Sequence, residues 1–268
     1  MRDFTLKTYK HLLQSFLSRN YKLINYSAYC KGVDADKFLI LRHDVDEIAG
    51  NALKMAKLEH ELGVSATYYF RIVQQSNKPE IIRKIASLGH EIGYHYEDLA
   101  LAKGDLQFAK QTFEENLAYF RTFYPVKTVC MHGSSTSKYD NREFWKNFEL
   151  KDFGLIGEPY LTTNFNEVYY LTDTGYAWDG GKFAVRDMVE NSFDVTYHSS
   201  DDIIKVVEAG TFPDKCLMLA HTLWTDGYFQ WTMLHIREFL RNNLKYVAQR
   251  NKLAKTIYSK LVKAYWKS

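Results

Sequence analysis

The chain has 268 residues, of which 46% are hydrophobic and 25% are charged, which is typical of a globular protein and excludes a disordered or fibrous one. Its cysteines, Cys30, Cys130 and Cys216, are far apart and form no CxxC pair, so we expect a reducing compartment and no disulfide framework. No stretch approaches the roughly 18 apolar residues of a membrane span, and no signal peptide is visible, so we expect a cytoplasmic protein.

The formal net charge of +3 is unevenly distributed along the chain. Between Ile236 and Ser268, nine Lys or Arg residues stand against one acid, Glu238, so this segment carries +8 and the other residues carry −5, the difference from +3. We therefore divide the sequence into a main domain, residues 1–235, and a basic C-terminal extension, residues 236–268.

Helices and strands are predicted to alternate along the first half of the chain. Helical spacing of apolar residues, Gly after a helix and Pro at a helix start define most of the boundaries. In chain order we expect a helix over 4–19, a strand over 37–46, a helix over 51–63, a strand over 64–72, a helix over 79–89, a strand over 90–95, a helix over 104–123, a strand over 126–133 and a helix over 141–150.

The pattern is less regular after residue 150. Residues 152–157, 167–175 and 193–199 resemble short strands, and a helix is expected over 200–210 with Ser200 or Asp201 as its N-cap. A strand over 215–222 follows, and the chain after about Phe229 is expected to be helical. Such alternation predicts βαβ units and a mainly parallel sheet. The number of units favours a barrel, with an open doubly wound sheet as the alternative.

Ionisable residues follow several of the predicted strands at their C-terminal ends: Asp44, Asp46, His95, Glu97, His132 and His221. In barrel enzymes the chemistry lies at this end of the strands. We therefore expect these side chains to form a functional site.

The stretch GHEIGYHYEDLA contains two histidines, His90 and His95, that cannot bind one metal together. In a strand, an offset of five residues puts them on opposite faces and roughly 16 Å apart along the chain. His95 lies at the C-terminal end of its strand, where a site is expected, with Glu97 on the same side. His90 lies at the opposite end, where a structural role is expected.

Asp44 and Asp46 in HDVD are two residues apart and therefore point to the same side of a strand, with Arg42 behind them. Two adjacent carboxylates repel each other unless a cation neutralises them or one takes up a proton. A divalent metal on one would leave the other free to act as a base. The alternative is that one of them caps the following helix.

Four segments in this order, LILRHDVD, ATYYF, LGHEIGYH and LMLAH, resemble the polysaccharide deacetylase superfamily, also called carbohydrate esterase family four. MHGSSTSKYDNREFW, TDTGYAW, YHSSDD and HTLWTD resemble a subgroup associated with surface-polysaccharide biosynthesis, and together these segments cover most of residues 38–227. The resemblance implies a distorted (β/α)7 barrel, here with N- and C-terminal helical extensions. It also implies metal-dependent removal of N- or O-acetyl groups from sugars.

The resemblance also implies roles for individual residues. Asp44 matches a general base and Asp46 a metal ligand, and His95 matches the first of two histidine ligands four residues apart. The second ligand would fall at position 99, which is Leu99. Either another side chain takes its place, or metal binding is weak or lost; the candidates are Glu97, Asp98 and His132.

His221 in LMLAH matches the family's general acid, and a proton donor with a pKa near neutrality suits imidazole. MHGSS stands where the family has an arginine-containing motif. We place the remaining candidates at the sugar-binding site: Arg42, Ser134, Asp173, Trp178 and Trp224. The implied cofactor is a divalent metal, zinc by its ligand types, which would polarise the acetyl carbonyl and activate water.

Apolar residues recur at three- to four-residue steps in the basic extension: Leu240, Leu244, Val247, Ala254, Ile257, Leu261 and Tyr265. They predict one long or two shorter amphipathic helices. The helix either packs on the barrel with its basic face in solvent or attaches loosely to the inner face of an anionic membrane. No nucleic-acid-binding motif accompanies the charge, so nucleic acid is not an expected partner.

The function expected from these features is deacetylation of an acetylated sugar or lipid-linked glycan in lipopolysaccharide or capsule biosynthesis. Two alternatives remain. One is a catalytically inactive barrel that binds a glycan or a partner protein, which Leu99 at a ligand position would suit. The other is a different metal-dependent hydrolase of C–N bonds on the same scaffold.

Overall fold

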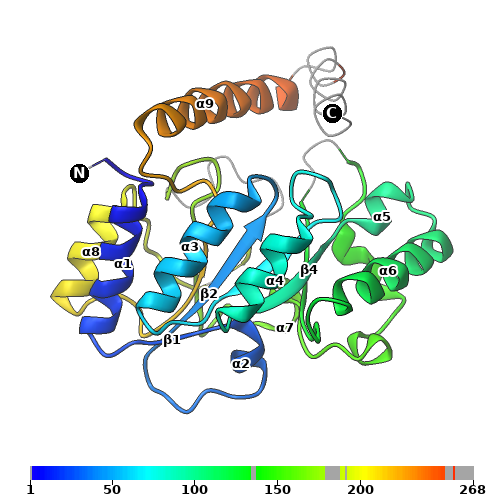
Figure 1. The fold of residues 1–268 in the computed structure, drawn as a ribbon, viewed down its shortest axis with the longest axis horizontal. Helices are drawn as coiled ribbons and strands as arrows, with labels where there is room; N and C mark the ends of the chain where they lie inside the picture. Colours follow the sequence, from blue (N-terminus) through cyan, green and yellow to red (C-terminus); the bar gives the residue numbers. More distant parts are fainter. Residues whose placement is uncertain (1, 134–136, 179–187, 191, 251–255, 257–268) are drawn as a thin grey trace.

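The computed structural model describes residues 2–133, 137–178, 188–190, 192–250 and 256, and shows a curled parallel sheet with helices around it (Figure 1). The strands are β1 (Lys22–Ile24), β2 (Phe38–Val45), β3 (Thr67–Phe70), β4 (Glu91–Tyr96), β5 (Val129–Met131), β6 (Tyr169–Thr172) and β7 (Lys215–Leu219). The α-helices are α1 (Leu6–Ser18), α2 (Tyr26–Cys30), α3 (Ala49–Glu61), α4 (Pro79–Ser87), α5 (Asp98–Leu101), α6 (Leu106–Arg121), α7 (Pro159–Thr162), α8 (Ser200–Ala209) and α9 (Tyr228–Arg250). Two 3₁₀ helices, η1 (Asn141–Lys146) and η2 (Leu150–Phe153), follow β5.

The strands are parallel, and their order is β5-β4-β3-β2-β7-β6. β1 and β3 share one side of β2: β1 pairs with residues 38–40 and β3 with residues 42–45, while β7 pairs along the other side. Among the described residues no strand pairing joins β5 to β6, so the sheet is a half-barrel. The predicted fold class, an α/β barrel of distorted form with helices added at both ends, is confirmed.

β2 shows how side-chain alternation builds this fold, since its eight residues are buried on both faces of the sheet. Phe38 and Ile40 face the concave side, where they pack in a small apolar cluster with Tyr170, Leu217 and other residues. Arg42 and Asp44 continue this inner row toward the C-terminal end. The concave side is therefore apolar at one end and charged at the end where the strands finish.

Gly93 is required where it stands in β4. A Cβ at this position would lie 2.3 Å from Cδ1 of Tyr69 and 2.9 Å from the carbonyl oxygen of Thr128. The Tyr69 ring fills this space and its hydroxyl forms a hydrogen bond with Oγ1 of Thr128. The missing side chain lets three neighbouring strands pack tightly just before β4 reaches His95.

Most predicted elements are present, and the exceptions lie in the irregular part of the chain. Residues 152–157 form the end of η2 and one bridge, Thr128 to Gly157, and residues 193–199 contain no strand, so two of the three short strands predicted there were wrong. The expected helix over 141–150 consists of η1 and the first residue of η2. The N-cap of α8 is Ser199, whose hydroxyl accepts from the Asp202 amide, and not Ser200 or Asp201.

A buried polar network joins the outer face of β2 to helices α1 and α3. Nδ1 of His43 donates to the carbonyl oxygen of Ala220 at 2.9 Å, and Nε2 donates to Glu59 at 2.7 Å. Tyr9 and Tyr68 each donate a hydroxyl to Glu59 at 2.6 Å. Because both ring nitrogens of His43 face acceptors, the imidazole is held as a cation. Burial opposes this charge, but Glu59 outweighs it, so the pKa of His43 is raised.

We expect Glu59→Gln to lower the free energy of unfolding by about 3–5 kcal/mol, because it leaves a buried cation without its counter-ion. Urea denaturation of this variant and of Glu61→Gln tests the prediction. Glu61 lies on the same helix but is exposed, so its substitution is expected to change stability by no more than about 0.5 kcal/mol. Equal effects of the two substitutions would contradict the role assigned to Glu59.

The pair also predicts a pH dependence of stability. Burial raises the pKa of Glu59, but His43 lowers it by more, so the net shift is downward and its contribution is lost as the pH falls through the folded-state pKa. The raised pKa of His43 works in the opposite direction, and its contribution is lost as the pH rises through that pKa. We therefore expect the urea concentration at the midpoint of unfolding to change less with pH in Glu59→Gln than in the wild type, both at low and at high pH.

Candidate metal and catalytic site

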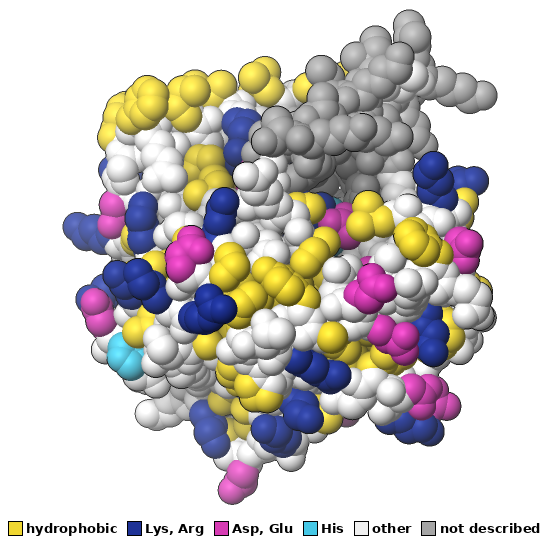
Figure 2. All heavy atoms as spheres, turned by 45° about the vertical axis from the view of Figure 1, so that its right-hand side comes forward, with side chains coloured by type: hydrophobic (Ala, Val, Ile, Leu, Met, Phe, Trp, Pro, Cys, Tyr) yellow, Lys and Arg dark blue, Asp and Glu magenta, His cyan; other side chains and the backbone are white. Residues whose placement is uncertain are grey.

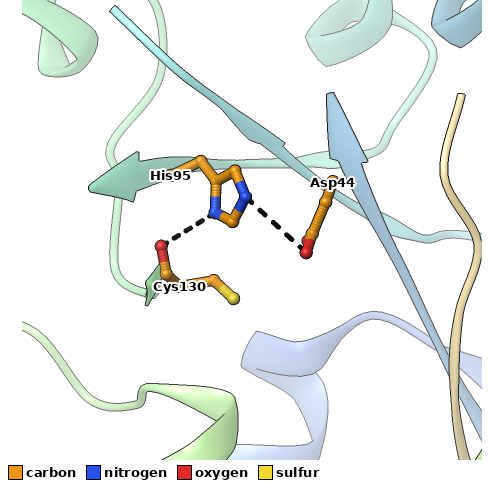
Figure 3. Close-up of side chains that lie close together, drawn as sticks. All are labelled: Asp44, His95 and Cys130. Carbon is orange, nitrogen blue, oxygen red and sulfur yellow. Dashed lines mark hydrogen bonds and ion pairs between the residues drawn. The ribbon is translucent and has the colours of Figure 1, made fainter. Parts of the chain in front are cut away.

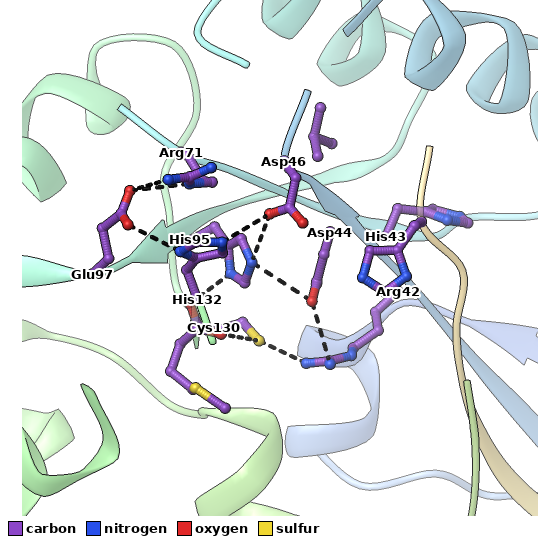
Figure 4. Close-up of polar contacts among 12 residues, drawn as sticks. Arg42, His43, Asp44, Asp46, Arg71, His95, Glu97, Cys130 and His132 are labelled. Carbon is purple, nitrogen blue, oxygen red and sulfur yellow. Dashed lines mark hydrogen bonds and ion pairs between the residues drawn. The ribbon is translucent and has the colours of Figure 1, made fainter. Parts of the chain in front are cut away.

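Four ionisable side chains meet at the C-terminal ends of three neighbouring strands (Figure 4). Asp44 lies near the end of β2, with Asp46 just beyond it; His95 lies in β4, and His132 directly follows β5. The pairing of His95 with Cys130 in the sheet brings the ends of β4 and β5 side by side. Residues from three segments far apart in the sequence thus face one small region.

Hydrogen bonds at Nδ1 fix the orientation of both histidines. Nδ1 of His95 donates to the carbonyl oxygen of Cys130 at 3.0 Å, and Nδ1 of His132 donates to Glu97 at 2.9 Å. When the rings are neutral, each Nε2 therefore carries its lone pair toward the carboxylates. A bonded Nδ1 and a free Nε2 are the usual arrangement of a histidine that binds a metal.

Oδ1 of Asp46 lies between the two imidazoles, 3.4 Å from Nε2 of His95 and 3.6 Å from Nε2 of His132. This oxygen is buried and has no hydrogen-bond partner among the described residues. Ligand atoms about 2.1 Å from a tetrahedral metal lie roughly 3.4 Å from one another. Each of the two distances is close to this separation and therefore suits a divalent cation bound between Asp46 and one imidazole.

The pKa shifts of Asp46 and His95 also indicate that a cation would stabilise these carboxylates. Burial opposes the charge of Asp46, yet His132 and His95 hold its pKa well below the usual range. Burial likewise lowers the pKa of His95, but Asp44 and Asp46 raise it by more. Two carboxylates and two imidazole lone pairs directed at one point repel each other unless a proton or a metal ion lies between them.

Among the described residues, the three ligand-type side chains whose atoms all lie within 4.8 Å of one another are Asp44, His95 and Cys130 (Figure 3). The Cys130 thiol is already engaged, since Nη1 of Arg42 donates to Sγ of Cys130 at 2.6 Å. A guanidinium cation at this distance competes with a metal for the sulfur. The chemistry of the donors therefore favours Asp46, His95 and His132.

The structure distinguishes between the three candidates, Glu97, Asp98 and His132, for the metal ligand that Leu99 cannot provide. Leu99 itself is buried in the main core. Glu97 accepts from Nε and Nη2 of Arg71, at 3.0 and 2.6 Å, as well as from His132. Burial raises the pKa of Glu97, but His132 and Arg71 outweigh it and bring the pKa down to about 2. Asp98 accepts from the Tyr94 hydroxyl and from Asn116, and burial raises its pKa to about 6. Of these three candidates we favour His132, whose Nε2 lies 3.6 Å from Oδ1 of Asp46.

Asp44 is buried beside His95, with Oδ2 3.7 Å from Nε2, and its Oδ1 has no hydrogen-bond partner among the described residues. Arg42 lies below it, with Nη2 3.5 Å from Oδ2 of Asp44 and 2.7 Å from the hydroxyl of Tyr160. The guanidinium is completely buried. Arg42, placed at the sugar site by the sequence, is thus a buried neighbour of Asp44 in the structure.

His221 lies just after β7 and is held by Asp173. Oδ1 of Asp173 accepts from the backbone amide and from Nδ1 of His221, at 2.9 and 2.8 Å, and Oδ2 accepts from Nε1 of Trp224 at 2.9 Å. Burial lowers the pKa of His221, but Asp173 outweighs it and raises the pKa to about 10. The imidazole is thus a cation at neutral pH, whereas the sequence suggested a pKa near neutrality.

Three of the expected sugar-binding residues are buried, and their polar groups bond to the protein. Asp173 bonds to His221 and to Nε1 of Trp224, and Nε1 of Trp178 donates to Oγ of Ser200. Ser134 lies outside the described residues. The site also contains Arg71, Cys130 and Tyr160, which were not predicted from the sequence. A charged or polar residue in or near a predicted strand is the only signal that marks them, and it does not reveal their partners.

No helix of the described chain combines the length and the hydrophobicity that a membrane crossing requires. No family model matches the sequence, and no curated protein matches it.

The chain is similar to several solved structures. One is the CE4 domain of a multidomain xylanase from the hindgut metagenome of Trinervitermes trinervoides, with 15% identity, 78% of this chain and 85% of that chain covered, and a TM-score of 0.42. A CE4 family pseudoenzyme from Bacillus anthracis has 12% identity, coverages of 77% and 60%, and a TM-score of 0.43. A peptidoglycan N-acetylglucosamine deacetylase has 16% identity, coverages of 82% and 91%, and a TM-score of 0.41.

Proposed function

We propose that this chain is a metal-dependent deacetylase of the carbohydrate esterase family four type, acting on an acetylated sugar. The observation that carries the proposal is the position of the Asp46 carboxylate between the free nitrogens of His95 and His132, with Asp44 beside them. We assign Asp46, His95 and His132 as metal ligands and Glu97 as the residue that orients His132.

A bound divalent metal, zinc by its ligand types, would supply a Lewis acid for the acetyl carbonyl and would make water a better nucleophile. Asp44 accepts a proton from the attacking water, whose oxygen forms a bond with the carbonyl carbon. Nε2 of His221 then gives a proton to the departing amine or hydroxyl, the bond to the acetyl carbon breaks, and acetate is released. Asp173 keeps His221 charged and oriented for this transfer.

The substrate class is a finer inference. The segments MHGSSTSKYDNREFW, TDTGYAW, YHSSDD and HTLWTD support an acetylated sugar in the biosynthesis of cell-surface polysaccharide, through their resemblance to proteins of that process. The same resemblance supports a lipid-linked glycan as an alternative form of the substrate. The three widely spaced cysteines, with no CxxC pair, suit a reducing compartment and therefore a cytoplasmic location. Because the polar groups of Asp173, Trp178 and Trp224 already bond within the protein, we expect other groups around the site to contact the substrate.

Release of acetate from a panel of N- and O-acetylated sugars tests this function, with linear and cyclic amides as the comparison. We expect zinc-loaded protein to release acetate from at least one acetylated sugar and to hydrolyse none of the linear or cyclic amides that lack a sugar. Hydrolysis of such an amide alone would assign the site to a different C–N hydrolase. Binding of the sugars without acetate release, by protein that contains stoichiometric metal, would make the chain a binding protein.

A further inference from the structure

The C-terminal helix α9 has its apolar face turned away from the protein. Six apolar residues at successive steps of three or four positions form one stripe along it: Phe229, Met233, Ile236, Leu240, Leu244 and Val247. Their exposed fractions range from 47% at Leu244 to 78% at Phe229. Figure 2 shows a row of hydrophobic side chains along the upper edge of the molecule, where α9 lies in Figure 1.

The face of α9 that contacts the protein carries polar residues beside apolar and aromatic ones. Glu238 and Asn242 are buried there, together with Leu234. At about 100° per residue, these three positions lie roughly 160° around the helix axis from the centre of the apolar stripe. Helices on globular proteins usually bury their apolar face and expose the polar one. The reversed arrangement in α9 leaves a continuous apolar surface without a partner among the described residues.

Specific polar contacts fix this orientation. Nη1 and Nη2 of Arg237 donate to the Glu47 carboxylate at 3.1 and 2.9 Å, and Nη2 of Arg241 donates to it at 3.2 Å. Nδ2 of Asn242 donates to the carbonyl oxygen of Gly175 at 2.9 Å. Rotating the apolar stripe inward would break all these bonds and take both arginines away from the buried Glu47 carboxylate. The outward position of the stripe is therefore built into the contacts of the helix.

Charge identifies the kind of partner that this face fits. From Asn242 to Ser268 the sequence contains seven Lys or Arg residues and no Asp or Glu. An apolar helix face that leads into an uninterrupted basic segment matches an anionic lipid bilayer, which offers an apolar interior and negative headgroups together. We propose that α9 binds this chain to the surface of an anionic membrane through the stripe from Phe229 to Val247.

The location of α9 also determines where a bound membrane would lie relative to the proposed metal site. Glu47, which anchors Arg237 and Arg241, follows Asp46 directly in the sequence. A membrane bound to the outer face of α9 therefore lies on the side of the molecule where the strands end and the metal-binding residues meet. Attachment through α9 places the site beside the bilayer, within reach of a substrate held at its surface.

Flotation of the full chain with lipid vesicles tests the proposal without requiring hydrolysis. The vesicles contain phosphatidylcholine alone or phosphatidylcholine with phosphatidylglycerol. We expect binding to the anionic vesicles that weakens with added salt, and little binding to the neutral ones. Ile236→Gln with Leu240→Gln should weaken the binding at least ~10-fold, because two membrane-inserted side chains are lost.

Leu101→Gln with Phe108→Gln is the matched control, since both residues are exposed apolar side chains away from α9. This variant should bind as the wild type does, and circular dichroism of both variants checks that they remain folded. Equal binding to neutral and anionic vesicles, or unchanged binding of the α9 variant, would overturn the proposal. So would a wild-type dimer in sedimentation velocity that the α9 variant dissociates, because the stripe would then bind a second copy.

Discussion

Replacing Asp46, His95 or His132 with alanine is expected to reduce the metal content of the protein from about one ion per chain to background. Each substitution removes one of the three side chains that we assign as ligands, and two protein ligands bind a divalent ion far more weakly than three. Elemental analysis of untagged protein, loaded with zinc and dialysed, measures the effect. His11→Ala, at an exposed histidine, is the control and should leave the metal content unchanged.

Glu97→Gln distinguishes a ligand from the residue that supports it. Glu97 orients His132 and is itself held by Arg71, so its loss should weaken zinc binding by about 10–100-fold without abolishing it at saturating zinc. Titration against a zinc-competing dye gives the affinities. If Glu97→Gln removes the metal while His132→Ala retains it, the assignment of the third ligand is reversed.

Asp44→Asn is expected to lower the rate of acetate release by about 10²–10⁴-fold while the zinc content stays unchanged. The amide has the same shape as the carboxylate, but it cannot take a proton from water. The comparison requires an acetylated sugar that the wild type hydrolyses, with zinc measured on the same samples so that loss of metal is not mistaken for loss of the base.

Asp36→Asn provides the matched control for this variant. Asp36 is exposed just before the other end of β2, so the same chemical change there should leave the rate unchanged. A wild-type rate for Asp44→Asn would contradict its role as the base. A proportional fall in zinc content would show instead that Asp44 supports metal binding.

The fold could be predicted where local patterns dominate. Alternating buried strands and amphipathic helices indicated a parallel α/β sheet because each unit buries its own apolar face. The prediction failed at residues 193–199, where a run such as FDVTYHS has strand-like composition but pairs with no strand in the structure. Strand formation depends on a partner, and the identity of the partner is not encoded in a short segment.

Sequence alone determined those features of the site that follow from spacing within one strand. The two-residue offset of Asp44 and Asp46 puts both on one face, and the five-residue offset of His90 and His95 separates them. His90 indeed lies away from the site, where Nε2 donates to the carbonyl oxygen of Ala56 and Nδ1 accepts from the amide of Ala66.

Only the tertiary structure decided which residues meet across strands. His132 is 86 residues from Asp46 and reaches it because β5 pairs with β4, and Asp173 is 48 residues from His221 and reaches it because β6 pairs with β7. The outward face of α9 was likewise invisible in its periodicity, because a pattern shows that a helix has an apolar side but not which way that side turns. Its direction is set by Glu47, a residue far away in the sequence that holds Arg237 and Arg241.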